Sequence, residues 1–398
     1  MSIRIIIEII DLLLWIIIAG NVFYVLFFAL ASLLPKKKKT LQSSISHQPS
    51  FLVLFPAYHE DAVITHSIES FLHQGYPKEL FHVAVISDNM SEETNQHLAS
   101  LPITLLCPNF EKSSKAKALQ HAISSISQHT SSAYDYVVVL DADNIVAPDY
   151  LTQLSTIAHP SMAIQCHRTA KNADNDIAAL DGLSEEINNS IFRKGHNRIG
   201  MSSALIGSGM CFDYHWFCTN VSKLDSAVED RELEALLMMQ GVHIHYAEDI
   251  LVMDEKVSSS DNFQRQRLRW MTGQVQAFLQ MLPSLPKAVI TSNINFIDKT
   301  IQQALIPRSI LLVLTPILCI IATLTSSICH LKWWLTFALL IIGLYTAIPS
   351  QLRTKVVLKK ATVLPRLVWR MATNIVFINV KNKDFIHTTH KGNPIRNK

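Results

Sequence analysis

Glycine is scarce in this chain of 398 residues, which contains only 11 of them. The sequence carries no glycine-rich phosphate loop, neither the dinucleotide-binding pattern nor the Walker pattern. If the chain binds phosphate, a metal ion and side-chain cations must therefore replace the backbone amides of such loops. The six cysteines form no CxxC pair and no cluster with zinc spacing, which predicts free thiols in a reducing compartment.

Charge is also sparse. Charged residues make up 17% of the chain and hydrophobic residues 49%, and the mean hydropathy is +0.22. This composition is too apolar for an ordinary soluble protein and too polar for a many-span membrane protein. The net charge of +3 is too small to indicate nucleic acid as a partner. The composition therefore predicts a soluble domain joined to a few membrane helices.

Three long apolar runs, 12–34, 305–328 and 333–348, predict these membrane helices, since about 20 apolar residues span a bilayer. The first run is too long for a cleaved signal peptide, and it follows the acidic residues Glu8 and Asp11. The lysines that follow it, at 36–39, place the next segment in the cytoplasm. The predicted organisation is an N-terminal membrane anchor (1–35), a basic linker (36–49), a cytoplasmic domain (50–282), an interfacial segment (283–304), two membrane helices (305–350) and a basic cytoplasmic tail (351–398).

The cytoplasmic domain alternates short apolar runs with helical patterns. The runs at 51–55, 82–87, 103–107 and 137–140 predict strands, and a helix is expected over 115–126. Strands separated by helices form a mainly parallel sheet, which binds ligands at the carboxyl ends of its strands. Polar residues follow three of the predicted strands, at 58–61, 88–89 and 141–143.

Two like charges, Asp141 and Asp143, directly follow the buried strand YVVVL. Alone at a strand end they would repel each other and be poorly solvated. A divalent cation between them would remove both problems, so the pair predicts a site for Mg²⁺ or Mn²⁺.

Three further clusters carry polar or flexible residues. IGSGM, at 206–210, predicts a flexible loop after an apolar run. Glu229 and Asp230 begin an amphipathic helix, where the helix dipole favours carboxylates. QRQRLRW, at 264–270, places three arginines and a tryptophan on one helix.

Taken in order, these clusters resemble the motifs of the membrane-bound family 2 glycosyltransferases, which include cellulose, chitin and hyaluronan synthases. PAYHED resembles the first nucleotide motif of that family, DAD its metal-binding DxD, GSGM its acceptor-side loop, and EDRELEALL and QRLRW its last two motifs. The resemblance spans 51–273 and implies a GT-A-like fold. His59 departs from it, where the family commonly has asparagine, and so does Ala116, where it has glycine.

The resemblance implies a role for each of these residues. Asp230 would be the catalytic base, and Asp141 and Asp143 would hold the metal. Donor-binding roles fall to Pro56, Tyr58, Glu60, Asp88, Lys115 and Asp141, with Lys117 as an alternative to Lys115. Acceptor or diphosphate contacts fall to Gly207, Ser208, Gly209, Gln266, Arg269 and Trp270. Arg265 and Arg267 are expected to face lipid phosphates instead.

The implied reaction is inverting transfer of a sugar from a nucleotide diphosphate sugar, expected to be a UDP-sugar, to a glycan or lipid-linked acceptor. The expected location is the cell inner or plasma membrane, with several membrane spans. Three alternatives stay open: a processive polysaccharide synthase, an inactive scaffold that binds nucleotide sugar, and a nucleotidyltransferase. The last usually carries a glycine-rich nucleotide loop, which this sequence lacks.

Overall fold

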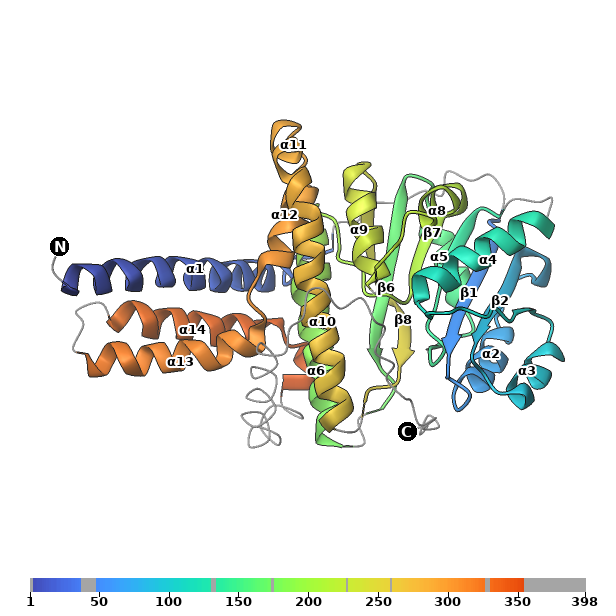
Figure 1. Cartoon of the computed structure of the whole chain (residues 1–398), viewed down its shortest axis with the longest axis horizontal. Coiled ribbons are helices and arrows are strands. Elements are labelled where there is room, and N and C mark those ends of the chain that lie inside the picture. Colours follow the sequence, from blue (N-terminus) through green and yellow to red (C-terminus); the bar gives the residue numbers. More distant parts are fainter. Residues whose placement is uncertain are drawn as a thin grey trace.

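The computed structural model describes residues 3–36, 48–129, 134–172, 175–226, 228–257, 260–325 and 330–353. These residues form an α/β domain and a rod of apolar helices that projects from it (Figure 1). Most of the predicted basic linker and nearly all of the predicted basic tail lie outside the described residues.

A mixed sheet forms the centre of the α/β domain, with the strand order β3-β2-β1-β4-β7-β6-β8-β5. β3, β2, β1 and β4 are parallel, as are β6 and β8, whereas β7 is antiparallel to both of its neighbours and β5 to β8. The predicted mainly parallel α/β sheet is thus confirmed. The strands are β1 (Phe51–Tyr58), β2 (Phe81–Asp88), β3 (Thr104–Leu106), β4 (Tyr136–Val139), β5 (Ile145–Val146), β6 (Met162–Ala170), β7 (Met210–Asp213) and β8 (His243–Asp254).

Helices cover both faces of this sheet and connect it to the rod (Figure 1). In the α/β domain they are α2 (Ile64–Leu72), η1 (Lys78–Leu80), α3 (Glu92–Ala99), α4 (Lys115–His129), α5 (Tyr150–Ile157), α6 (Asp176–Asn188), the π-helix η2 (Asn189–Gly195), α7 (His196–Arg198), α8 (Tyr214–Val221) and α9 (Glu229–Met239). Those that follow the sheet are α10 (Ser260–Met281), η3 (Leu282–Ser284), α11 (Leu285–Ile290) and α12 (Ile294–Ala304).

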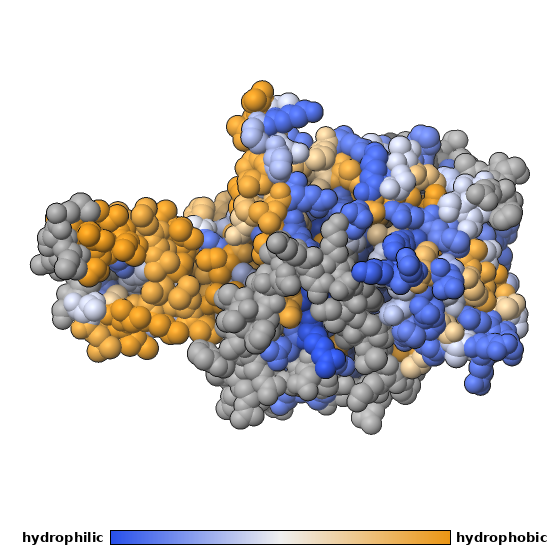
Figure 2. Space-filling view, in the orientation of Figure 1, coloured by the Kyte–Doolittle hydropathy of each residue, from blue (hydrophilic) through white to orange (hydrophobic). Residues whose placement is uncertain are grey.

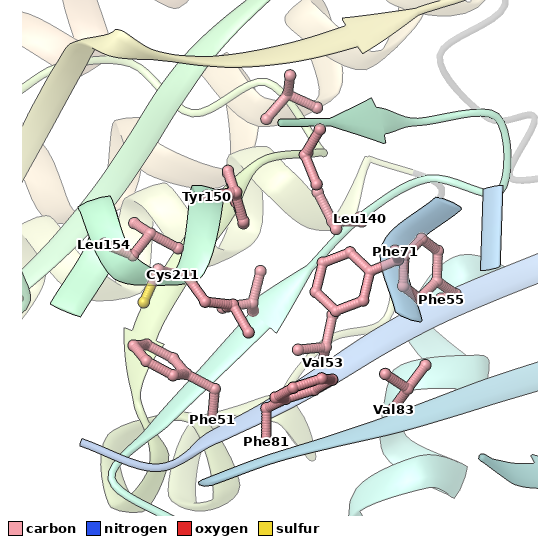
Figure 3. Packing of buried hydrophobic residues seen from close by; sticks show 14 of the residues in the cluster. Phe51, Val53, Phe55, Phe71, Phe81, Val83, Leu140, Tyr150, Leu154 and Cys211 are labelled. Atoms are coloured by element: carbon pink, nitrogen blue, oxygen red, sulfur yellow. The ribbon is translucent and has the colours of Figure 1, made fainter. Parts of the chain in front are cut away.

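The central strand β1 is buried on both faces, which explains its unbroken apolar sequence. Phe51, Val53 and Phe55 point to the face covered by α2 and α5, where Figure 3 shows Phe71 and Leu154 among them. The alternate residues of β1 pack on the other face, against α4, α8 and α9. Because both faces of β1 are packed, polar residues that bind a ligand can stand only at the end of this strand.

Three helices form the apolar rod: α1 (Ile3–Ala31), α13 (Arg308–Leu324) and α14 (His330–Ala347), the last followed by the short α15 (Ser350–Arg353). Hydrophobic side chains cover the rod, whereas the α/β domain is mainly hydrophilic (Figure 2). Among the described residues, α1 and α14 are long and apolar enough to cross a membrane. α13 counts as a third span only together with α12, at a bend of 61°.

The third predicted span therefore differs from the run 305–328. α13 begins at Arg308, three residues later than the run, because Pro307 caps the helix and separates it from α12. It has 17 residues and ends at Leu324. The predicted interfacial segment 283–304 contains α11 and α12, whose exposed side chains include Val289, Ile290 and Ile294.

A close backbone contact docks α1 on the π-helix η2. A Cβ atom at Gly195 would lie 2.3 Å from the carbonyl oxygen of Phe28. The Phe28 ring stacks on the His196 imidazole, with ring centroids 3.5 Å apart, and the Tyr24 hydroxyl donates to Asp298 of α12 at 2.6 Å. Glycine at position 195 is what permits this approach.

We predict that Gly195→Ala weakens this docking. The added methyl group meets backbone rather than a flexible side chain, so the free energy of unfolding should fall by about 1–3 kcal/mol, which is typical of overpacking. The measurement is the thermal unfolding midpoint of the detergent-solubilised protein. Gly20→Ala in α1 is the matched control, because a Cβ there meets nothing within 4 Å. Equal midpoints for the two variants would contradict the prediction.

Candidate active site

The first polar group of the site lies where β1 and β2 end side by side. Tyr58 and Asp88 are paired in the sheet register. The next residues, His59 and Asn89, both adopt left-handed backbone conformations, with φ of +52° and +55°. Asparagine tolerates this region better than most residues, which gives a physical reason for the asparagine expected at position 59. Burial raises the pKa of Asp88, whose side chain accepts a hydrogen bond from Asn89 at 3.0 Å.

A cavity of about 520 Å³ opens at this edge of the sheet. It brings together most of the predicted site residues from seven separate segments. Those that line it are Pro56, Tyr58, Glu60, Asp88, Lys115, Asp141, Asp143, Gly207, Asp230, Gln266, Arg269 and Trp270.

Two predicted site residues, Ser208 and Gly209, do not line this cavity. Ser208 is fully buried. The amide of Gly209 donates to the carbonyl of Val139 in β4, and a Cβ there would lie 2.9 Å from the Val252 side chain. These two residues therefore join the loop to the sheet, and Gly207 is the part of GSGM that faces the cavity.

The two aspartates after β4 are held differently. Asp143 is buried; its Oδ2 accepts from the amide of Glu255 at 2.7 Å and its Oδ1 from Asn144 at 3.2 Å. Asp141 is more exposed, and its Oδ1 accepts from Lys115 Nζ at 2.5 Å. Hydrogen bonds and a lysine thus reduce the repulsion predicted from the sequence.

The pair also fits a hard divalent cation. Both carboxylates line the cavity, and Mg²⁺ is commonly held by one or two carboxylates with substrate phosphates completing its shell. The described residues include no group of three or more His, Cys, Asp and Glu side chains arranged for a metal. A metal at Asp141 and Asp143 would therefore need oxygen ligands from the bound substrate or water.

Lys115, the first residue of α4, connects three parts of the site. Its Nζ donates to Asp141 and to the carbonyl of Gly207 at 2.6 Å, and lies 3.5 Å from Glu229 Oε1. Burial alone would lower the pKa of Lys115, but the Asp141 and Glu229 carboxylates outweigh it and raise that pKa. Lys117 instead donates to the carbonyl of Lys112 and does not line the cavity. Of the two lysines, the site contains Lys115.

Glu229 and Asp230 begin α9, as predicted, and their carboxylates lie beside the Gly207 turn. An atom placed as Cβ on Gly207 would lie 3.7 Å from Asp230 Oδ2 and 3.9 Å from Glu229 Oε1. Gly207 has φ of +83°, a left-handed backbone conformation that favours glycine. Burial raises the pKa of Glu229 to about 7, although Lys115 opposes this shift. The loop, Lys115 and the start of α9 thus surround one small polar space.

The last motif lies on α10, as predicted. Gln266, Arg269 and Trp270 line the cavity, and the buried Gln266 Oε1 has no hydrogen-bond partner among the described residues. Arg269 acts electrostatically on Glu229, Asp141 and Asp230. A cation therefore faces the acidic end of the cavity from α10.

The expectation that Arg267 faces lipid phosphates is wrong. Arg267 is buried, forms an ion pair with Asp181 of α6, and lies over the Trp270 ring with its guanidinium carbon 4.3 Å from the ring centroid. It faces inward because Asp181 of α6 supplies a buried carboxylate for it. Arg265 is exposed on the same helix.

Sequence reasoning missed a buried ion network beneath Asp141. Arg168 of β6 pairs with Glu185 of α6 at 3.1 Å, and Lys256 pairs with Glu185 at 2.5 Å and with Asp254 at 2.8 Å. Arg168 also donates to the carbonyl of Ile206, which anchors the loop. The residues come from distant segments, so spacing could not connect them. The sequence offered one signal for this network: charged residues stand at the ends of two apolar strands, Arg168 in β6 and Asp254 in β8.

We predict that Glu229 makes stability depend on pH. Its folded-state pKa of about 7 lies above its ordinary value of 4.5, so the folded protein keeps a proton that the unfolded chain releases between these values. The stabilisation is complete below about pH 4.5 and is lost as pH rises through about 7. In Glu229→Gln, the decrease in the free energy of unfolding between low and high pH should be smaller by about 1–3 kcal/mol.

The check is the unfolding midpoint of the metal-free protein at pH 5 and pH 8. Glu93→Gln, an exposed glutamate of α3, is the control. If Glu229→Gln loses as much stability as the control between the two pH values, the role assigned to Glu229 is wrong.

Comparison with known proteins gives a family and a fold. The sequence pattern described as "Glycosyltransferase like family 2" matches residues 48–273. No curated protein matches the chain in sequence. A mannosyltransferase from Pyrobaculum calidifontis, solved with GDP-Man and Mn²⁺, is structurally similar, with a TM-score of 0.55 and 17% identity over 84% of this chain and 97% of that one.

Two other solved structures match more weakly. TarS 1–349 of S. aureus has a TM-score of 0.43 and 13% identity over 82% of this chain and 88% of that one. Glucosyl-3-phosphoglycerate synthase of Mycobacterium tuberculosis, solved with Mn²⁺, UDP and phosphoglyceric acid, has a TM-score of 0.37 and 14% identity over 52% and 72%. The mannosyltransferase supports the GT-A-like fold. The family match covers more than half of the chain, so this protein belongs to glycosyltransferase family 2.

Proposed function

We propose that this protein transfers a sugar from a nucleotide diphosphate sugar to an acceptor hydroxyl at a membrane surface, with inversion at the anomeric carbon. One observation carries the proposal. A single cavity holds a paired carboxylate site, a carboxylate pair at a helix N-terminus and a cationic helix face, as such a reaction requires. The family match supports the reaction class.

The donor would lie along the strand ends. Tyr58 and Asp88, at the paired ends of β1 and β2, are suited to hold the nucleoside, with Pro56 and Glu60 beside them. Asp141 and Asp143 would hold Mg²⁺ or Mn²⁺, which when bound supplies positive charge for the diphosphate leaving group. We propose a UDP-sugar as donor, but the similar mannosyltransferase was solved with GDP-Man, so the donor panel must include both nucleotides.

The chain supplies further positive charge of its own. Lys115 and Arg269 both line the cavity and both act electrostatically on Asp141, Glu229 and Asp230. Lys115 pairs with Asp141 and Glu229, and a bound diphosphate would offer it a second anionic partner. Fixed cations aimed at developing negative charge are a large source of catalysis in such sites.

Asp230 is the proposed base. It stands at the start of α9 beside the Gly207 turn and lines the same cavity as Asp141 and Asp143. Its carboxylate would accept the proton of the acceptor hydroxyl as that oxygen attacks the anomeric carbon. Trp270 and Gln266 would form the wall and a polar contact for the acceptor sugar.

The membrane setting is part of the proposal. The apolar rod and the exposed apolar residues of α11 and α12 support membrane attachment. We propose a cell inner or plasma membrane, and the lysines at 36–39 favour a cytoplasmic α/β domain. In the described part of the chain two helices can span, or three with the bent pair, and so small a number favours addition to a glycan or lipid-linked acceptor over export of a long polymer. The processive synthase remains the alternative, tested by the length of the product.

We predict that Asp230→Asn lowers turnover by about 10²–10⁴ while nucleotide binding is retained, because a general base acts on the acceptor proton and not on the donor. The measurement is release of nucleoside diphosphate by the detergent-purified protein with a panel of UDP- and GDP-sugars and a membrane lipid extract as acceptor source. Turnover in Asp230→Asn within about threefold of the unmodified protein would reject Asp230 as the base.

We also predict that Asp143→Asn removes metal-dependent turnover and metal-dependent nucleotide binding together, since the carboxylate is the proposed ligand. Asp149→Asn is the matched control, because Asp149 is exposed on the following turn and lies outside the cavity. Binding is measured by titrating the nucleotide with Mn²⁺ or with a chelator. Metal-dependent binding without turnover for any donor and lipid extract would instead support the inactive scaffold.

A further inference from the structure

The cavity extends beyond the proposed catalytic residues toward the apolar rod. Figure 1 shows α6, α10 and α12 between the rod and the sheet. In this direction the cavity is lined by apolar side chains from the rod and from α6, namely Val25, Leu180, Leu183, Ile187, Leu312 and Leu344. One continuous space therefore joins the polar site to helices whose outer surface is apolar.

Arg308 stands in this part of the cavity as the first residue of α13. It is partly buried, and its Nη2 donates to Asn188 Oδ1 at 2.6 Å and to the carbonyl of Ser184 at 3.2 Å. Among the described residues, no carboxylate forms an ion pair with it. The N-terminus of a helix already carries partial positive charge, which adds to that of the guanidinium.

A second arginine, Arg193 of the π-helix, lines the same cavity and is 4% exposed. Its Nη1 donates to Asn189 at 2.8 Å, but its Nε has no hydrogen-bond partner among the described residues. Glu185 acts on it electrostatically but is already ion-paired with Arg168 and Lys256. Arg193 is therefore a buried cation without a carboxylate of its own in the described part of the chain.

Positive charge is thus in excess at this end of the cavity. Arg193 and Arg267 both act electrostatically on Arg308, and of the three, Arg267 is the one with a paired carboxylate, Asp181. A buried guanidinium without an anion carries a large desolvation penalty. An anionic ligand would remove it, and the planar guanidinium matches phosphate oxygens especially well.

We propose that Arg308 and Arg193 bind the phosphate of a lipid-linked acceptor, whose hydrocarbon chain lies along the apolar lining between α6 and the rod. This assignment rests on the proposed function, because it places the acceptor sugar on the Asp230 side of the same cavity. A soluble phosphate would satisfy the arginines but leave the apolar lining without a partner. A lipid phosphate satisfies both, so the lipid is the source that the lining favours.

Binding of a lipid phosphate by the full-length protein in a phosphate-free detergent tests the assignment. The probes are farnesyl phosphate, farnesol and inorganic phosphate, and affinity is followed by tryptophan fluorescence. We expect farnesyl phosphate to bind at least about tenfold more tightly than farnesol, since hydrogen bonds to charged groups are worth that much. Arg308→Gln should abolish this difference and leave farnesol binding unchanged. Arg265→Gln, an exposed arginine on α10, should retain it.

Equal binding of farnesyl phosphate and farnesol would overturn the proposal, as would equal losses in Arg308→Gln and Arg265→Gln. Inorganic phosphate that binds as tightly as farnesyl phosphate would overturn the lipid source. Thermal unfolding midpoints show that each variant is folded. Release of nucleoside diphosphate by the same preparations separates the two proposals. Turnover without Arg308-dependent lipid binding rejects this one alone, and Arg308-dependent binding without turnover rejects the proposed reaction alone.

Discussion

The Lys115 ammonium is the interaction on which the geometry of the site depends. Asp141, Glu229 and the carbonyl of Gly207 all lie within reach of its single nitrogen, and each belongs to a different segment. Without that charge, two carboxylates from β4 and α9 would face each other across a buried space. Because Lys115 is the first residue of α4, and α4 packs on β1 and β2, its position is fixed by the core. The core thereby determines where the loop and α9 meet the strand ends.

The sheet explains why the chemistry lies at this edge. β1 is packed on both faces, and its neighbours β2 and β4 are parallel to it, so their polar residues emerge together at the carboxyl ends. β7 runs antiparallel between β4 and β6, and the loop that enters it passes the same edge. Gly209 fits between the strands there, which leaves Gly207 as the turn that faces the cavity. Because β7 is antiparallel to β4, β7 begins at the edge of the sheet where β4 ends. The loop that leads into β7 therefore joins the strand ends in forming the site.

Much of this arrangement follows from the sequence, and the rest does not for a physical reason. The strands and the carboxylate pairs could be predicted because their signals are local. An apolar run is followed directly by two aspartates at 136–143, and two acidic residues begin an amphipathic helix at 229–230. The motif predicts ligand contacts for Ser208 and Gly209, because a motif does not show which of its residues packs on the sheet. Helix position alone predicts a lipid-facing Arg267, because its ion-pair partner, Asp181, is remote in sequence. Long-range pairs such as Arg168 with Glu185 are invisible to local periodicity.

Local sequence patterns also could not predict how the apolar rod contacts the site. α12 contacts α9 on one side, through an Arg231–Gln303 hydrogen bond, and α1 on the other, through Tyr24 and Asp298. Lys299 of α12 is fully buried and lies 3.8 Å from Glu234, one turn along α9 from Asp230. A shift of α1 would therefore move α12, and with it α9, the helix that carries the proposed base. Buried polar contacts of this kind tolerate little displacement, because each separated group would be left without its partner in a desolvated space. In the proposed membrane setting, the rod would therefore act as a support that sets the depth of the site relative to the bilayer, which a flexible tether between anchor and domain could not do.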